Sequence, residues 1–167
     1  MTLISGFLLA IGGYASAQDA VGCEGLSAYR AEMFKVGKAF IAQTVKDGVP
    51  ANRDVATFSS AEWTKKAADL AVYQADLEAI APPPWLKNWH DLRIERAGLD
   101  EQIALAAASR GLYGALLFKG ASDRIDAENK AATAAAFAAC SDFAVFARDW
   151  DALDGDINGT PVATPSS

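Results

Sequence analysis

The sequence predicts an all-α domain, an up-down-up-down four-helix bundle with one interhelical disulfide. Alanine dominates a composition that is 51% hydrophobic, and alanine is the strongest helix former. Glycine and proline fall at the edges of segments rather than throughout the chain. Four segments repeat apolar residues at steps of three and four, which is the period of one helix face.

The first predicted helix spans about residues 22–46. Gly48 and Pro50 follow directly and are expected to end it. Its apolar face consists of Leu26, Tyr29, Met33, Val36 and Phe40.

The second predicted helix begins at a capping box. In "SSAEW" the Ser59 side chain can accept a backbone hydrogen bond, and Glu62 can return one to the Ser59 backbone. The helix must end before Pro82, because the residue ahead of a proline avoids the helical region. Its apolar face consists of Trp63, Ala67, Leu70, Tyr73 or Gln74, Leu77 and Ile80.

The third predicted helix takes Pro84 as its first turn and runs to about Phe118. At 1.5 Å per residue it would be about 50 Å long, whereas the second helix would be nearer 30 Å. The hairpin of the third and fourth helices must therefore project beyond its partners, or break at Gly98 or Gly111. Its apolar stripe consists of Trp85, Trp89, Leu92, Leu99, Ile103 and Ala106.

The fourth predicted helix runs from Asp123 to about Leu153, after an end at Gly120 and a cap at Ser122. Residues 154–167 lack an apolar period and are expected to form a disordered tail. This tail contains "DGDING", the first half of a calcium loop, but position twelve is Pro165 instead of Glu, which favours a flexible acidic tail. The apolar face of the helix contains Ile125, Ala132, Ala136, Cys140, Phe143, Phe146 or Ala147, Trp150 and Leu153.

The N-terminus has the pattern of an export signal. Residues 1–17, "MTLISGFLLAIGGYASA", carry no charge, contain an apolar run too short to span a bilayer, and end in a small-x-small motif. We therefore expect a signal peptide over residues 1–17, a bundle domain over 18–153, and a periplasmic or extracellular location. A lipoprotein anchored through Cys23 is the alternative, although Gln18 and Asp19 interrupt the apolar stretch that a lipobox needs.

The chain contains two cysteines, Cys23 and Cys140. An even count in an exported protein favours one disulfide, which would close a loop of more than a hundred residues. Two unrelated buried thiols are the alternative, since free cysteine is often buried.

The formal net charge is −6. A nucleic-acid partner would need a basic face, so this class of partner is not expected. Binding to anionic lipid is disfavoured for the same reason.

Bundle connectivity predicts where the aromatic residues gather. The start of the third helix shares one end of the bundle with the end of the second, the start of the first and the end of the fourth. Five residues should therefore lie near each other: Trp85, Trp89, His90, Tyr29 and Trp150. This end is the candidate interaction surface, and an ordinary aromatic cap on the core is the alternative. The candidate residues are Trp85, Trp89, His90, Arg93 and Trp150.

His90 is the only histidine, and its sequence neighbours give it no second metal ligand one helical turn away. We expect a ring nitrogen of His90 to form a hydrogen bond with a carbonyl at the end of the second helix. The segment "APPPWLKNWHDL" is therefore interpreted as a structural turn between two helices rather than as a ligand-binding site. A haem site between Met33 and His90 is a weaker alternative, and no covalent haem motif is present.

The sequence shows no catalytic constellation, so an enzyme is not expected. It lacks the Gly-x-Ser-x-Gly elbow, and the predicted disulfide would remove the thiol that a Cys/His pair needs. The helical carboxylates are interpreted as solvated surface charges; they include Asp69, Asp76, Glu78, Glu95, Glu101 and Glu128.

Four features together resemble exported bacterial helical-bundle proteins of unknown function. They are a Cys near the mature N-terminus, a helix that ends in "IAPPP", the tryptophan-flanked His90 in "WLKNWHDL", and a late Cys in an Ala-rich helix. The resemblance implies a helical-bundle fold and an exported location, and it implies no activity.

These observations favour an exported interaction or binding module with no cofactor. Its partner, a protein or a small molecule, is not specified by the sequence. The alternative is a haem- or metal-binding bundle that uses His90.

Overall fold

The computed structural model describes residues 22–158, and every regular element in that part of the chain is a helix. The predicted signal peptide and residues 159–167 lie outside the described residues. The long helices are α1 (Leu26–Lys46), α2 (Ser60–Glu78), α3 (Lys87–Arg110), α5 (Lys119–Ala139) and α6 (Phe143–Asn158); the short ones are η1 (Val55–Thr57), η2 (Pro84–Leu86), α4 (Leu112–Ala115) and η3 (Leu116–Phe118).

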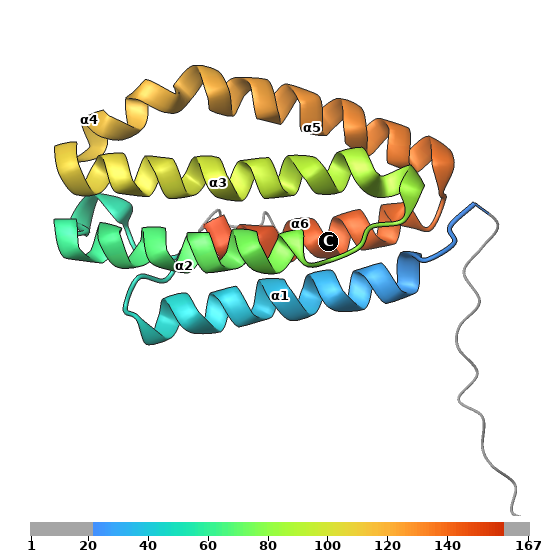
Figure 1. Ribbon diagram of the computed structural model, residues 1–167, viewed down its shortest axis with the longest axis horizontal. Coiled ribbons are helices and arrows are strands. Elements are labelled where there is room, and N and C mark those ends of the chain that lie inside the picture. The colour runs from blue at the N-terminus through green and yellow to red at the C-terminus, as the bar shows by residue number, and fades with distance from the viewer. Residues whose placement is uncertain (1–21, 159–167) are drawn as a thin grey trace, which may run out of the picture.

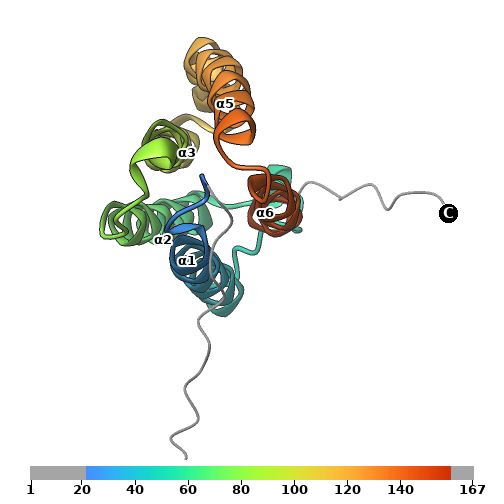
Figure 2. The same cartoon turned by 90° about the vertical axis from the view of Figure 1, so that its right-hand side faces the viewer.

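The long helices alternate in direction along the chain (Figure 1). Helices α1, α2 and α3 form an antiparallel meander, α5 returns along α3, and α6 runs back beside α1. Seen from the end, the long helices lie around a common axis (Figure 2), and all five contribute side chains to one core. The predicted all-α class is confirmed, but the predicted fourth helix is replaced by two helices, α5 and α6.

The break between α5 and α6 lies at Cys140, whose backbone is extended (φ −145°, ψ 116°). Ser141 and Asp142 follow, and their carbonyls accept backbone bonds from the first turn of α6. Ser and Asp are strong helix-start residues, which explains why the chain can turn here. The disulfide between Cys23 and Cys140 is confirmed, with a Cα–Cα distance of 4.9 Å, and it ties this turn to the segment before α1.

Helix α3 breaks at Gly111, one of the two positions expected from the helix lengths. Gly111 has a φ of +64°, which lies in the region that favours glycine. Gly98 instead continues α3, and a Cβ there would lie 2.8 Å from Gln74 Oε1 on α2. Helix α5 begins at Lys119, so the expected end at Gly120 and cap at Ser122 are wrong: both residues lie inside the helix.

The remaining boundaries follow the sequence signals closely. The first helix ends at Lys46 as predicted but begins at Leu26, after Gly25 in a left-handed conformation. The capping box of α2 is present, with the backbone N–H of Ser59 2.8 Å from Glu62 Oε2. Helix α6 extends to Asn158, so residues 154–158 of the expected tail are helical.

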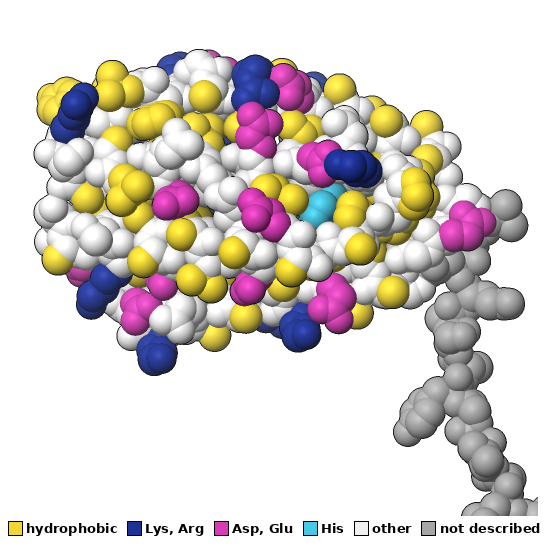
Figure 3. All heavy atoms as spheres, viewed as in Figure 1, with side chains coloured by type: hydrophobic (Ala, Val, Ile, Leu, Met, Phe, Trp, Pro, Cys, Tyr) yellow, Lys and Arg dark blue, Asp and Glu magenta, His cyan; other side chains and the backbone are white. Residues whose placement is uncertain are grey.

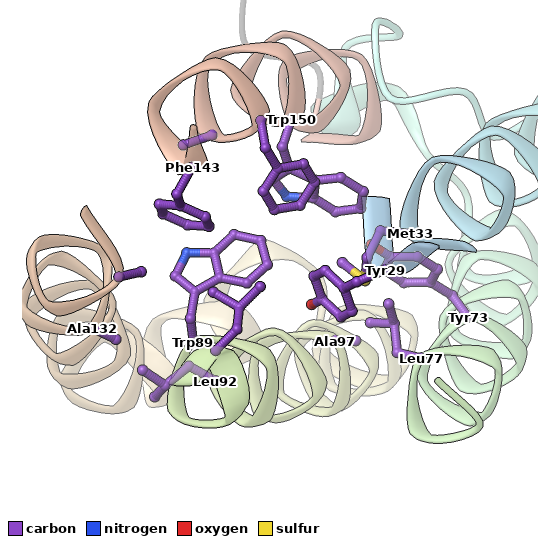
Figure 4. Packing of buried hydrophobic residues seen from close by; sticks show 14 of the residues in the cluster. Tyr29, Met33, Tyr73, Leu77, Trp89, Leu92, Ala97, Ala132, Phe143 and Trp150 are labelled. Carbon is purple, nitrogen blue, oxygen red and sulfur yellow. The ribbon is translucent and has the colours of Figure 1, made fainter. Parts of the chain in front are cut away.

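The core is formed by apolar side chains from all five long helices. Large aromatic groups of α1, α3 and α6 fill one part of it, and small alanines of α5 cover the side of α3 (Figure 4). Among residues 22–158, no helix has the length and apolar character that a membrane span requires.

Candidate functional site

The chain turns sharply between α2 and α3 at residues 79–86, which we call the corner. Pro82, Pro83 and Pro84 prevent α2 from continuing, and Pro84 opens η2. The corner packs on the start of α1: a Cβ at Gly25 would lie 3.2 Å from the Pro83 ring. The Trp85 indole N–H also donates to the backbone oxygen of Glu24 at 3.2 Å. The corner is therefore held against the same segment that the disulfide fixes.

His90 is buried in the first turns of α3, and its Nδ1 lies 2.9 Å from the hydroxyl of Tyr29 on α1. Burial lowers the pKa of His90, against smaller opposing effects from Asp91 and the Leu77 carbonyl. The ring is then neutral near pH 7, so Nδ1 can accept a hydrogen bond from the Tyr29 hydroxyl. Burial raises the pKa of Tyr29, which keeps its hydroxyl protonated.

A carbonyl near the end of the second helix lies beside the His90 ring, as expected, and Tyr29 of α1 holds the ring in addition. Leu77, near the end of α2, does place its carbonyl close enough to favour the protonated ring. Within the described residues, however, Nε2 makes no hydrogen bond, and the ring is held by Tyr29 of α1. His90 thus ties α3 to α1, with the Leu77 carbonyl of α2 beside its ring.

Trp89 and Trp150 lie close together, as the connectivity of the bundle predicts, and their ring centroids are 6.3 Å apart. Both side chains are buried, so the prediction that they form an exposed surface is wrong, and the alternative of an aromatic part of the core describes them. Phe143 and Phe146 of α6 both pack edge-on against Trp89, and Figure 4 shows Phe143 beside the indole. The reason is that α6 turns back into the bundle, which places its apolar face inside.

Trp85 and Arg93 are the two candidate residues that reach the surface in part. Trp85 is half-buried and packs at 90° against Phe143. The guanidinium of Arg93 lies over the Trp89 ring, 4.4 Å from its centroid, which is a cation–π arrangement. These two side chains cover the buried rings of Phe143 and Trp89 from outside.

A groove of about 810 Å³ lies between α1 and the corner, and we call it the corner groove. Its lining contains Val36 and Ala39 of α1, Ile80 at the end of α2, and the three prolines 82–84. Tyr29 also lines it and, being buried, lies at its bottom. The residues that form the corner thus also form one wall of an open, mainly apolar site.

The rim of the corner groove carries more negative than positive charge. Glu24, Glu32 and Asp76 line it together with one cation, Lys35. Lys35 lies 3.4 Å from Glu32 in an exposed ion pair, so part of its charge is compensated. The groove therefore combines apolar walls with an acidic edge.

The haem or metal alternative for His90 depends on a ring nitrogen that faces a ligand. Nδ1 faces Tyr29, and Met33 is buried among packed side chains that include Tyr29 and Leu77 (Figure 4). In the described part of the chain, no three His, Cys, Asp or Glu side chains lie close enough to hold a metal ion. No observation on residues 22–158 favours this alternative.

One acidic residue was misinterpreted from the sequence. Asp69 is only 7% exposed, and it is not the solvated surface charge that its helix pattern indicated. Burial, together with a hydrogen bond and repulsion from Asp47, raises the pKa of Asp69 to about 6. Lys66 on the same helix is largely buried as well, and burial lowers its pKa. The signal was available, since Lys66 and Asp69 lie one turn before the buried Leu70 and Tyr73.

No family model, curated protein or solved structure matches the chain.

Proposed function

We propose that the protein is an exported binding module whose corner groove holds an apolar, positively charged segment of a partner protein. The observation that carries the proposal is the groove itself. Its volume of about 810 Å³ lies in the usual range for ligand sites, roughly 300–1,000 Å³. A groove of this size with apolar walls and an acidic rim matches a segment that alternates aliphatic and basic side chains.

The rigidity of its walls also supports a binding role. The disulfide fixes the segment before α1, and prolines set the backbone of the opposite wall. Hydrogen bonding between Tyr29 and His90 holds the bottom of the groove against α3. A site formed in advance loses little conformational freedom on binding, which favours affinity.

Export is the second part of the proposal. It is supported by the small-x-small pattern that ends at Ala17 and by the disulfide, a bond that persists in oxidising compartments. The buried aromatic residues of α3 and α6 belong to the core of the module, and the partly exposed Trp85 and Arg93 pack on them from outside.

The proposal is tested by titrating the protein with two peptides of equal length, one alternating Leu and Lys and one alternating Leu and Glu. We expect calorimetry to show binding of the Leu/Lys peptide only. Ala39→Trp places a bulky ring on the groove wall and should abolish binding. Ala131→Trp is the matched control, because Ala131 is an exposed alanine on α5.

The charge contribution is tested by combining Glu32→Gln with Asp76→Asn. This variant should weaken binding of the Leu/Lys peptide about tenfold at low salt, because two exposed charges act mainly through long-range attraction. Equal binding of both peptides, or an Ala39→Trp variant that binds like the parent, would contradict the proposal.

A further inference from the structure

The turn between α3 and α5 exposes an unusual amount of apolar surface. Tyr113 is 83% exposed, Leu117 68% and Leu116 67%, and Leu112 beside them is also exposed. These four residues, which we call the apolar tip, belong to α4 and η3 at the end of the molecule opposite the disulfide (Figure 1). Their spacing of one, three and one residues places them on one side of a helical turn.

The backbone of this turn is positioned so that its apolar side chains face outward. Gly114 is buried against α3, where a Cβ would lie 2.4 Å from the backbone oxygen of Ala106. Only a residue without a side chain permits this contact, so the glycine side of the turn faces the protein. Tyr113 and Leu117 therefore lie on the side that faces away from α3.

The charge around the apolar tip differs from that of the whole protein. The net charge of the chain is −6, yet no Asp or Glu occurs from Gln102 to Ser122. Two exposed cations, Arg110 and Lys119, flank the tip, and Lys119 also pairs with Asp123 at 2.6 Å. Apolar and basic side chains lie together at this end of the molecule (Figure 3).

We propose that the apolar tip docks the protein on the surface of a membrane that contains anionic lipid. Leucine and tyrosine side chains flanked by Arg and Lys are the combination that partitions into the headgroup region. The negative net charge of the chain does not prevent this contact, because attraction to a charged surface acts within about a Debye length and depends on the local charge. The apolar side chains would enter the interface, and Arg110 and Lys119 would lie against lipid phosphates.

A second copy of the chain is the less suitable occupant. The four exposed side chains offer on the order of 400–500 Å², whereas a stable dimer needs roughly 800 Å² from each partner. A narrow turn at the end of an elongated molecule suits a fluid surface, because lipid adapts to projecting side chains. A membrane also requires no matching shape.

The experiment measures sedimentation of the disulfide-bonded protein with vesicles of phosphatidylcholine alone or mixed with phosphatidylglycerol. We expect binding to the mixed vesicles, and a loss of about tenfold or more when Leu116→Ser and Leu117→Ser are combined. Arg110→Gln should lower binding to the mixed vesicles about fivefold without changing binding to phosphatidylcholine. The matched control is Val45→Ser with Val72→Ser, two comparably exposed aliphatic residues of α1 and α2.

Analytical ultracentrifugation without lipid completes the test. A monomer that binds mixed vesicles through the leucines supports the proposal. A dimer that dissociates in the leucine variant would assign the tip to a second copy and overturn it. No vesicle binding, or an equal loss in the valine control, would overturn it as well. Peptide binding in the corner groove is a separate measurement, so either proposal can fail alone.

Discussion

The hydrogen bond between Tyr29 and His90 should make a measurable contribution to the free energy of unfolding. Tyr29→Phe removes one hydroxyl and leaves the aromatic packing with His90 and Phe146 in place. Nδ1 of His90 then loses its partner at 2.9 Å inside the protein. An unsatisfied buried acceptor costs about 1–3 kcal/mol. At about 3 °C per kcal/mol for a domain of this size, the midpoint should fall by about 3–9 °C.

The assay is thermal and urea unfolding of Tyr29→Phe, His90→Leu and the double variant. The double-mutant cycle should give a coupling free energy of about 1–2 kcal/mol, because both groups act in one bond. Tyr113→Phe is the matched control, since its hydroxyl belongs to a side chain that is 83% exposed. If Tyr29→Phe and Tyr113→Phe melt at the same temperature, the bond does not stabilise the fold and this prediction is wrong.

The burial of His90 also makes the free energy of unfolding depend on pH, in a direction that can be predicted. Its pKa is lowered in the folded protein, so the unfolded chain binds the proton more tightly below pH ~6.5. The His90 contribution to the free energy of unfolding is therefore full above pH ~6.5 and falls as the pH drops below it. His90→Leu should remove this part of the acid sensitivity, and an unchanged pH profile would contradict the assignment of a neutral buried ring.

Two further predictions concern the disulfide and Asp69. Replacing Cys23 and Cys140 together by Ser should lower the free energy of unfolding in urea by up to about 4–5 kcal/mol, because the bond closes a loop with a sequence separation of 117; an unchanged urea midpoint would contradict this. The raised pKa of Asp69, about 6, means that the folded state binds the proton more tightly and that stability falls as the pH rises from about 4 to about 6. Asp69→Asn should therefore raise the free energy of unfolding at pH 7 by an amount on the order of 1–3 kcal/mol and leave it nearly unchanged at pH 4. Asp76→Asn, at an exposed position of α2, should change it at neither pH.

The helices that sequence reasoning located well are those with a strong local signal at each end. Helix α2 has a capping box at Ser59 and prolines after its last turn, and both features act within a few residues. The break at Cys140 was missed because the apolar period continues across it into Phe143. The alanines before Cys140 do not show which face of the helix is buried, since alanine suits a buried and an exposed position alike. Ser141 and Asp142 were the local signal for a new helix.

The site was harder to predict than the fold, because periodicity does not distinguish the inside of a bundle from its end. The proximity of Trp89 and Trp150 followed from connectivity, but their burial depends on α6 turning back, a long-range consequence of the break at Cys140. The corner groove lies between α1 and the proline segment, and its presence depends on how far apart these two segments pack. A residue pattern along the chain does not specify that distance. Connectivity also placed Tyr29 near His90, but the hydrogen bond between these positions, 61 residues apart, required the three-dimensional structure.

The two proposals describe opposite ends of one molecule, and their geometry makes them compatible. The corner groove adjoins the start of α3 and the apolar tip follows its end (Figure 1). Helix α3 has 24 residues, which at 1.5 Å per residue separates the two ends by roughly 36 Å. This distance exceeds the Debye length at physiological salt, about 8 Å. Salt would therefore screen the repulsion between the acidic rim and anionic lipid when the tip is docked. A uniformly acidic surface could not combine the two functions. Separating the acid-free segment 102–122 from Glu24, Glu32 and Asp76 allows an acidic protein to meet a membrane at one end and hold a basic segment at the other.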